Sequence, residues 1–229
     1  MLLERGFTLG QIGLITAAQG FVVMLLELPT GALADSLGRR RMLLLASTAQ
    51  VAAVALFVFA ETLTALVVVF ALQGVHGALE SGPLDAWYVD LTQAADPDAD
   101  IERGLAQAGT VLGVAISFGA LASSGLVALG LTAGFDPLVL PLIASFVLEI
   151  VHLAAVVVLM VEPRPTFTAR ALRQSVTATP VTVRDAVRLV RGSTVLLALV
   201  TVELLWGFGM TAFENCTPAR LAEVLGDRD

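Results

Sequence analysis

Three features of the sequence predict an all-α membrane protein, a polytopic bundle of six transmembrane helices. Hydrophobic residues make up 57% and charged residues 14% of the chain, against about 45–50% and about 25% in soluble domains. Six apolar runs have the roughly 20 residues that a helix needs to cross a bilayer. Nearly all the arginines lie in alternate connections between these runs. The lipid bilayer of the cell (inner) membrane is therefore the expected surrounding.

The six predicted spans follow one another through mostly short polar connections. They cover residues 12–30, 42–60, 63–84, 105–131, 137–160 and 195–213. The first is the least apolar, because Gln19 and Glu27 lie within it. The connections after the first, second and fourth spans are short, which favours antiparallel helix hairpins.

A charged turn between the first two spans is the most informative stretch. Residues 27–41 contain Pro29, Gly31, Asp35, Gly38 and the run Arg39–Arg41. Proline and glycine predict a helix end near residues 29–31, and Gly38 can adopt a positive φ in the turn. Three arginines enter hydrocarbon only at high cost, so the turn marks one side of the membrane.

The positions of the other arginines predict which side that is. Ten of the thirteen fall in the connections after the first, third and fifth spans. The alternate connections contain only acidic charges, Glu61 and Asp136. Basic loops remain in the cytoplasm. We therefore expect the charged turn inside the cell and both chain ends outside.

Residues 161–194 form the longest polar segment and are predicted to be a cytoplasmic linker. Thr182 and Asp185 have the spacing of a capping box. After them, valines and an alanine share one helical face, and Arg184, Arg188 and Arg191 another. This pattern is typical of a basic amphipathic helix at the inner leaflet. A solvated linker helix is the alternative.

The charged turn resembles the signature loop between helices two and three of the major facilitator superfamily, G-x-L-A-D-x-x-G-R-[KR]. Here it reads Gly31-Ala-Leu-Ala-Asp35-Ser-Leu-Gly38-Arg39-Arg40-Arg41. The segment from Ser81 to Asp90 also resembles the end of helix four in one bacterial branch. The resemblance implies that the six spans are family helices two to seven.

The family arrangement implies three parts of the chain. Residues 1–160 would form most of an N-terminal bundle, 161–194 the central linker, and 195–229 the first helix of a second bundle with an external tail. The family fold has one more helix before Met1 and five after Asp229. We therefore expect a fragment of a larger transporter, whose second half is a missing partner.

The resemblance implies secondary active transport of a small solute by alternating access, with efflux as the expected direction. Uptake by a symporter, or a truncated membrane protein that transports nothing, are the alternatives. Many proton-driven exporters of the family carry an arginine in helix four where this chain has Phe70. Their helix five carries a Gly-Pro signature, and residues 105–131 contain no proline. The usual proton-coupling arrangement is thus not supported.

The resemblance makes Gly31, Asp35, Gly38 and the three arginines a gating motif. Asp35 would tie the two halves together in one transport state, and Arg39 could orient its carboxylate through a charge-assisted hydrogen bond. Breaking and remaking such a contact would bias outward-open against inward-open states. A charged turn that only determines topology is the alternative.

Ionisable residues within the spans are the other candidate site residues, because buried charge in a membrane is costly. They are Glu27, His76, Glu80, Glu149, His152 and Glu203. The pairs His76–Glu80 and Glu149–His152 could carry a coupling proton, since histidine titrates near neutral pH. Mutual neutralisation between packed helices is the alternative for each pair. Glu203 has no basic partner in its span, and Glu27 is expected to pair with the loop arginines.

Other classes of protein lack support in the sequence. There is no Walker loop and no Gly-x-Ser-x-Gly motif, so we expect neither an enzyme nor a bound cofactor. A single cysteine, Cys216, excludes a cysteine-based metal site. Basic and aromatic residues are too few to suggest a nucleic-acid partner.

Overall fold

The computed structural model describes residues 2, 5–128, 139–161, 184–185 and 187–226. Every regular element in this part of the chain is an α-helix. Six helical segments are long and apolar enough to cross a membrane. The predicted fold class, an all-α bundle with six spans, is therefore confirmed.

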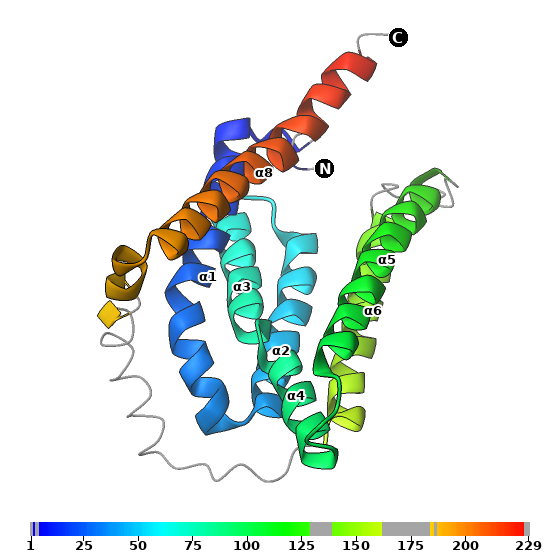
Figure 1. The fold of residues 1–229 in the computed structure, drawn as a ribbon. Coiled ribbons are helices and arrows are strands. Elements are labelled where there is room, and N and C mark those ends of the chain that lie inside the picture. Colours follow the sequence, from blue (N-terminus) through cyan, green and yellow to red (C-terminus); the bar gives the residue numbers. More distant parts are fainter. Residues whose placement is uncertain (1, 3–4, 129–138, 162–183, 186, 227–229) are drawn as a thin grey trace.

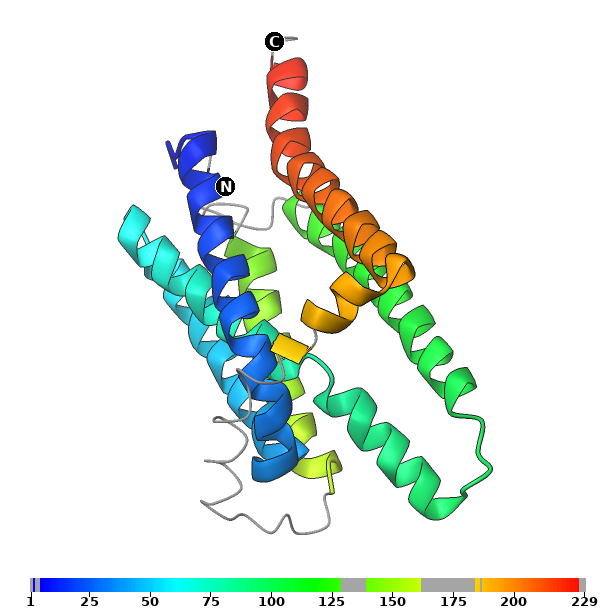
Figure 2. The same ribbon diagram turned by 60° about the vertical axis from the view of Figure 1, so that its left-hand side comes forward.

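Seven helices of the described structure have defined bounds (Figure 1). In chain order they are α1 (Leu9–Leu37), α2 (Arg39–Phe59), α3 (Leu63–Glu80), α4 (Pro83–Ala95), α5 (Ile101–Ala128), α6 (Val139–Leu159) and α8 (Thr194–Gly226). Helices α1, α2 and α3 pack together, and α6 packs against α2. In Figure 2, α5 and α8 lie at the periphery of this group.

Helix α1 is longer than the sequence suggests. It begins with a capping box, in which the Thr8 side chain accepts from the Gln11 backbone. It then continues through Pro29 and Gly31 to Leu37, so the predicted helix end near these residues is wrong. Packing explains the difference, because tertiary contacts outweigh local propensity and α1 packs against α3. Here the buried Thr30 hydroxyl lies 2.8 Å from the Ala78 carbonyl oxygen of α3.

A single residue, Gly38, makes the turn between α1 and α2. Its φ of +91° lies in the region that favours glycine. The backbone N–H of Gly38 closes the end of α1 by donating to the Ala34 carbonyl. The positive φ predicted for Gly38 is confirmed.

The third predicted span is two helices in the structure. Helix α3 ends at Glu80, and α4 begins at Pro83 after a break at Gly82. Gly82 has the left-handed conformation, with φ +86° and ψ −26°. Pro83 occupies the first helical turn, where its missing N–H costs nothing. The prediction of one helix over residues 63–84 is therefore corrected to a broken helix reaching Ala95.

The buried core lies among the first three helices. Its main cluster contains Ile15 of α1, Ala53 of α2, and Leu66 and Val69 of α3. A smaller cluster joins Leu43 of α2 to Val156 and Met160 at the end of α6. The core thus holds α2 between α3 on one side and α6 on the other.

Helices α5 and α8 are apolar but expose most of their surface. No described residue of α5 is buried, and Phe118 is 71% exposed. On α8, Phe208 is 81% exposed. Apolar faces of this extent suit lipid or a further protein surface better than water.

The region around the predicted linker is described in part. Arg184, Asp185 and residues 187–192 are helical, and all three linker arginines of this segment are exposed. Thr182 and Ala186, which belong to the predicted capping box and apolar face, lie outside the described residues. Helix α8 extends to Gly226, so most of the predicted external tail continues the helix.

Candidate functional site

Arg39 connects the charged turn to α4. Its guanidinium donates to the Ala86 carbonyl oxygen and forms an ion pair with the Asp90 carboxylate. The Arg39 side chain is 18% exposed, whereas the Asp90 side chain is 67% exposed. The carbonyl contact is therefore the better shielded of the two.

A second arginine of the turn reaches the end of α6. Arg40 Nη2 donates to the Val157 carbonyl oxygen at 2.6 Å. From α4, Trp87 Nε1 donates to the Val161 carbonyl oxygen at 3.1 Å. The last carbonyls of a helix have no partner within it. Side chains from two other elements thus supply donors at this end of α6, whereas Arg41 is exposed.

Gly31 and Asp35 belong to the last turns of α1. Their surroundings lie outside the part of the chain for which side chains are described. The predicted contact between Asp35 and Arg39 therefore stays a prediction. The described contacts of the turn connect α2 to α4 and α6.

Two glutamate–histidine pairs lie on α3 and α6. His76 Nε2 is 2.9 Å from Glu80 Oε2, one turn along α3. The other ring nitrogen of His76, Nδ1, lies 3.1 Å from the Ala46 carbonyl oxygen of α2. On α6, His152 Nδ1 is 3.7 Å from Glu149 Oε2, which is longer than a hydrogen bond.

The packing of α2 between α3 and α6 brings these two pairs into one neighbourhood. Residues of α3 and α6 line a common pocket, which includes Gln73 of α3 and Glu149 of α6. The sequence predicts each pair from its helical spacing but gives no sign that the two pairs meet. These four residues, called here the Glu–His cluster, thus lie on the two helices that pack against α2.

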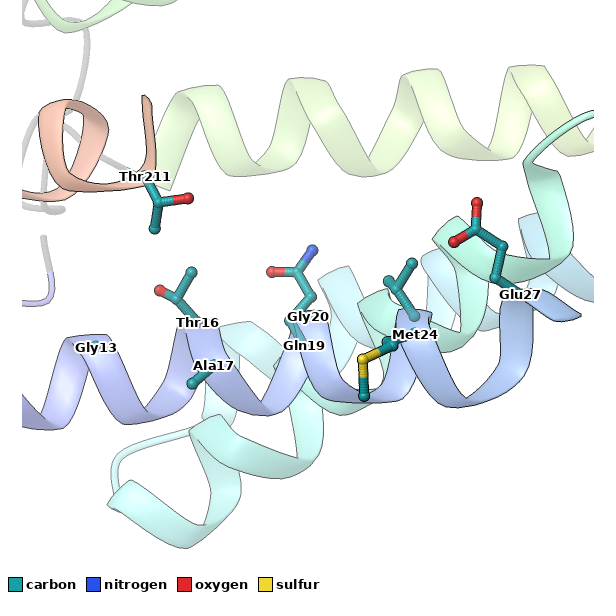
Figure 3. Close-up of a pocket in the computed structure, with 9 residues that line it drawn as sticks. Gly13, Thr16, Ala17, Gln19, Gly20, Met24, Glu27 and Thr211 are labelled. Carbon is teal, nitrogen blue, oxygen red and sulfur yellow. The ribbon is translucent and has the colours of Figure 1, made fainter. Parts of the chain in front are cut away.

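Glu27 lines a cavity of about 790 Å³ beside α1. The same cavity is lined by Thr16 and Gln19 of α1 and by Thr211 of α8. Figure 3 shows the side chains of Thr16, Gln19 and Glu27 along one face of α1, with Thr211 of α8 facing Thr16. The walls are mainly apolar, and the polar groups are few and separated, as in small-molecule sites.

Glu203 lies apart from the Glu–His cluster. It is an exposed residue of α8, and the main contacts of α8 in the described structure are with α1. Glu203 and Glu27 are thus on the two helices that meet at the larger cavity, and the histidines are on the other helices.

Several polar residues of these sites were missed from the sequence. Gln50 and Gln73 lie in a smaller pocket between α2, α3 and α6, and Thr16 and Gln19 in the larger cavity. A signal was present, because an isolated amide within an apolar span is as conspicuous as a charge. The prediction from the sequence considered only ionisable side chains as site residues.

A comparison with models of protein families shows to which family the chain belongs. The family model described as Major Facilitator Superfamily matches residues 1–227. No curated protein and no solved structure matches the chain. The match covers all seven described helices, including the charged turn and α8. The chain belongs to the Major Facilitator Superfamily.

Proposed function

We propose that this protein moves a small amphipathic solute across the cell membrane by alternating access, in the direction of export. The cavity between α1 and α8 carries this proposal. Its volume of about 790 Å³ lies within the range of about 300–1,000 Å³ typical of small-molecule sites. It is open to a solute that is apolar along most of its length.

The lining of this cavity suits such a solute. Ala17, Val23 and Met24 supply apolar wall, and Met24 can adapt its shape to different ligands. Gln19 and Glu27 offer hydrogen-bonding groups about two turns apart on α1. A solute with an apolar body and separated polar ends would contact both kinds of wall.

Alternating access requires two bodies that rock about the site. We assign α1 to α6 to the first body and α8 to the second, with residues 161–194 as the cytoplasmic linker. The cavity lies where α1 meets α8, which is the boundary between the two bodies in this assignment. The His76–Glu80 and Glu149–His152 pairs are the groups we propose for coupling to a proton.

The test is a flux assay on the full-length transporter encoded at this locus, purified into proteoliposomes with a pH-sensitive dye inside and assayed with a panel of amphipathic solutes. We expect solute-dependent flux, and a reduced rate in the Gln19→Ala and Glu27→Gln variants. Glu61→Gln, in the exposed connection after α2, is the matched control and should transport normally. Absence of solute or proton movement would favour a membrane protein that does not transport.

The gating role of Asp35 has a separate test. Asp35→Asn keeps the size of the side chain and removes its charge, so a gate that depends on the carboxylate should fail. We expect impaired transport with normal membrane insertion and yield. Normal flux in this variant would leave the turn as a topological signal only.

A further inference from the structure

A second pocket lies inside the group of helices, away from the α1–α8 cavity. Its volume is about 300 Å³, and it is lined by residues of α2, α3 and α6. Its lining includes Gln50, Phe57, Phe70, Gln73, Ser145 and Glu149. Two amides, a hydroxyl and a carboxylate thus line a small pocket together with two aromatic rings.

Two oxygens in this pocket are buried and accept no hydrogen bond from the described residues. They are Oε1 of Gln50, on α2, and Oε2 of Glu149, on α6. The Nδ1 atom of His152 is 3.7 Å from Glu149 Oε2, beyond hydrogen-bond distance. Buried acceptors without donors are costly. A ligand that brings donors and positive charge would satisfy both.

The aromatic residues indicate what kind of cation fits. The rings of Phe57 and Phe70 have centroids 6.5 Å apart and are tilted by 53°. Phe57 already receives one cation, because the Arg5 guanidinium lies 5.6 Å from its centroid. Aromatic faces attract organic cations, whereas hard metal ions prefer a shell of six or more oxygens.

We propose that this pocket binds a primary organic ammonium with a compact apolar substituent. Its N–H groups would donate to Glu149 Oε2 and Gln50 Oε1, the carboxylate would balance the charge, and the substituent would pack on Phe57 and Phe70. This site is distinct from the proposed solute cavity, which is lined by α1 and α8. Binding here does not depend on transport.

The test measures binding of benzylammonium to the purified full chain in detergent by titration calorimetry. Benzyl alcohol is the neutral probe of similar shape, and benzyltrimethylammonium keeps the charge without N–H donors. We expect benzylammonium to bind at least about tenfold more tightly than benzyl alcohol, since bonds to charged groups are the stronger ones. Benzyltrimethylammonium should fall between them.

Variants locate the site. Glu149→Gln should weaken benzylammonium at least about tenfold, and Gln50→Glu, which adds a second carboxylate, should strengthen it. A gain of affinity cannot come from misfolding, so Gln50→Glu keeps the test decisive if Glu149→Gln is unstable. Gln107→Leu, at an exposed position of α5 outside both pockets, is the matched control and should bind normally. Equal affinity for the charged and neutral probes, or unchanged affinity in both pocket variants, would overturn the proposal.

Discussion

At the scale of single residues, the closest approach between α1 and α3 depends on Gly74. A Cβ at this position would lie 2.7 Å from the Gln19 carbonyl oxygen and 2.9 Å from Val22 Cβ. A backbone oxygen cannot move aside as the end of a flexible side chain can. Gly74 is therefore required by the packing of these helices, as small residues are in many membrane-protein interfaces.

Substitution of Gly74 by alanine should separate α1 from α3 and lower stability by about 1–3 kcal/mol, the usual cost of overpacking. Gly77→Ala is the control on the same helix, because its Cβ would meet only Val23 Cγ2 at 3.6 Å. The measurement is the thermal unfolding temperature of each purified variant in detergent. Equal unfolding temperatures for the two variants would contradict this packing.

Arg39 and Asp90 form an ion pair in which the two residues should contribute unequally. Asp90 is 67% exposed, and exposed ion pairs contribute only about 0–1 kcal/mol. Arg39 is more buried and also donates to the Ala86 carbonyl oxygen. Loss of Arg39 would leave that acceptor unpaired as well.

We therefore expect Arg39→Ala to destabilise the protein by about 1–2 kcal/mol more than Asp90→Ala does. Arg41→Ala is the control in the same turn, and its exposed side chain predicts a small effect. Unfolding temperatures of the three variants check this order. A larger effect of Asp90→Ala would show that the ion pair, and not the carbonyl contact, fastens the turn to α4.

At the scale of helices, two glycines determine where helices change direction. Gly82 has φ +86° and ψ −26°, a left-handed conformation that asparagine also tolerates. Gly38 has φ +91° and ψ 144°, close to a region that is almost restricted to glycine. The two turns therefore differ in which side chains they can accept.

This difference predicts that Gly82→Asn will be tolerated and Gly38→Asn will not. The Gly38 variant should lose about 1–3 kcal/mol, the usual cost of a residue held in such a conformation. Gly82→Ala should fall between them, because alanine in the left-handed region costs about 1–2 kcal/mol. Yield of monodisperse protein and unfolding temperature measure the effect. A Gly38→Asn variant as stable as Gly82→Asn would refute it.

Helix existence could be predicted from the sequence, but helix ends could not. Apolar length alone predicts six spans, because lipid leaves the backbone few alternatives to a helix. Pro29 and Gly31 suggested a helix end. In the structure α1 continues past both residues and packs against α3. The Ser81–Gly82–Pro83 sequence does break a helix, although the predicted span continued through it.

The candidate sites could be predicted only in part. Helical spacing pairs His76 with Glu80 and Glu149 with His152, because these contacts are local to one helix. Their meeting beside α2 depends on the packing of three helices, which no local pattern encodes. The pairing of Arg39 with Asp90, 51 positions later in the chain, is likewise a tertiary contact.

At the scale of the whole molecule, the connections lie at alternate ends of the bundle. Figure 1 shows the α1–α2 turn and the α4–α5 connection at its lower end, and the α2–α3 connection at its upper end. The arginines of the α1–α2 turn contact α4 and the end of α6. The α1–α2 turn with its three arginines and the start of α5 with Arg103 are therefore at the same end, and the positive-inside rule predicts that this end faces the cytoplasm.

Cysteine labelling in intact cells tests this orientation. Cys216 is the only cysteine in the chain, so Cys216→Ser gives a background free of thiols. On this background, Glu61→Cys lies in the exposed α2–α3 connection and Asp98→Cys in the exposed α4–α5 connection. We expect a membrane-impermeant maleimide to label position 61 in intact cells and position 98 only after permeabilisation.

The physical reason is that the three arginines of the turn cannot follow α1 and α2 across the hydrocarbon without a large cost. Moving positive charge should therefore reverse the labelling. Replacing Arg39–Arg41 by glutamine and adding arginines at the exposed residues 62 and 64 should decrease labelling at position 61 and increase it at position 98 in intact cells. Labelling of both positions in intact cells, or of position 98 alone before the charges are moved, would contradict the assigned orientation.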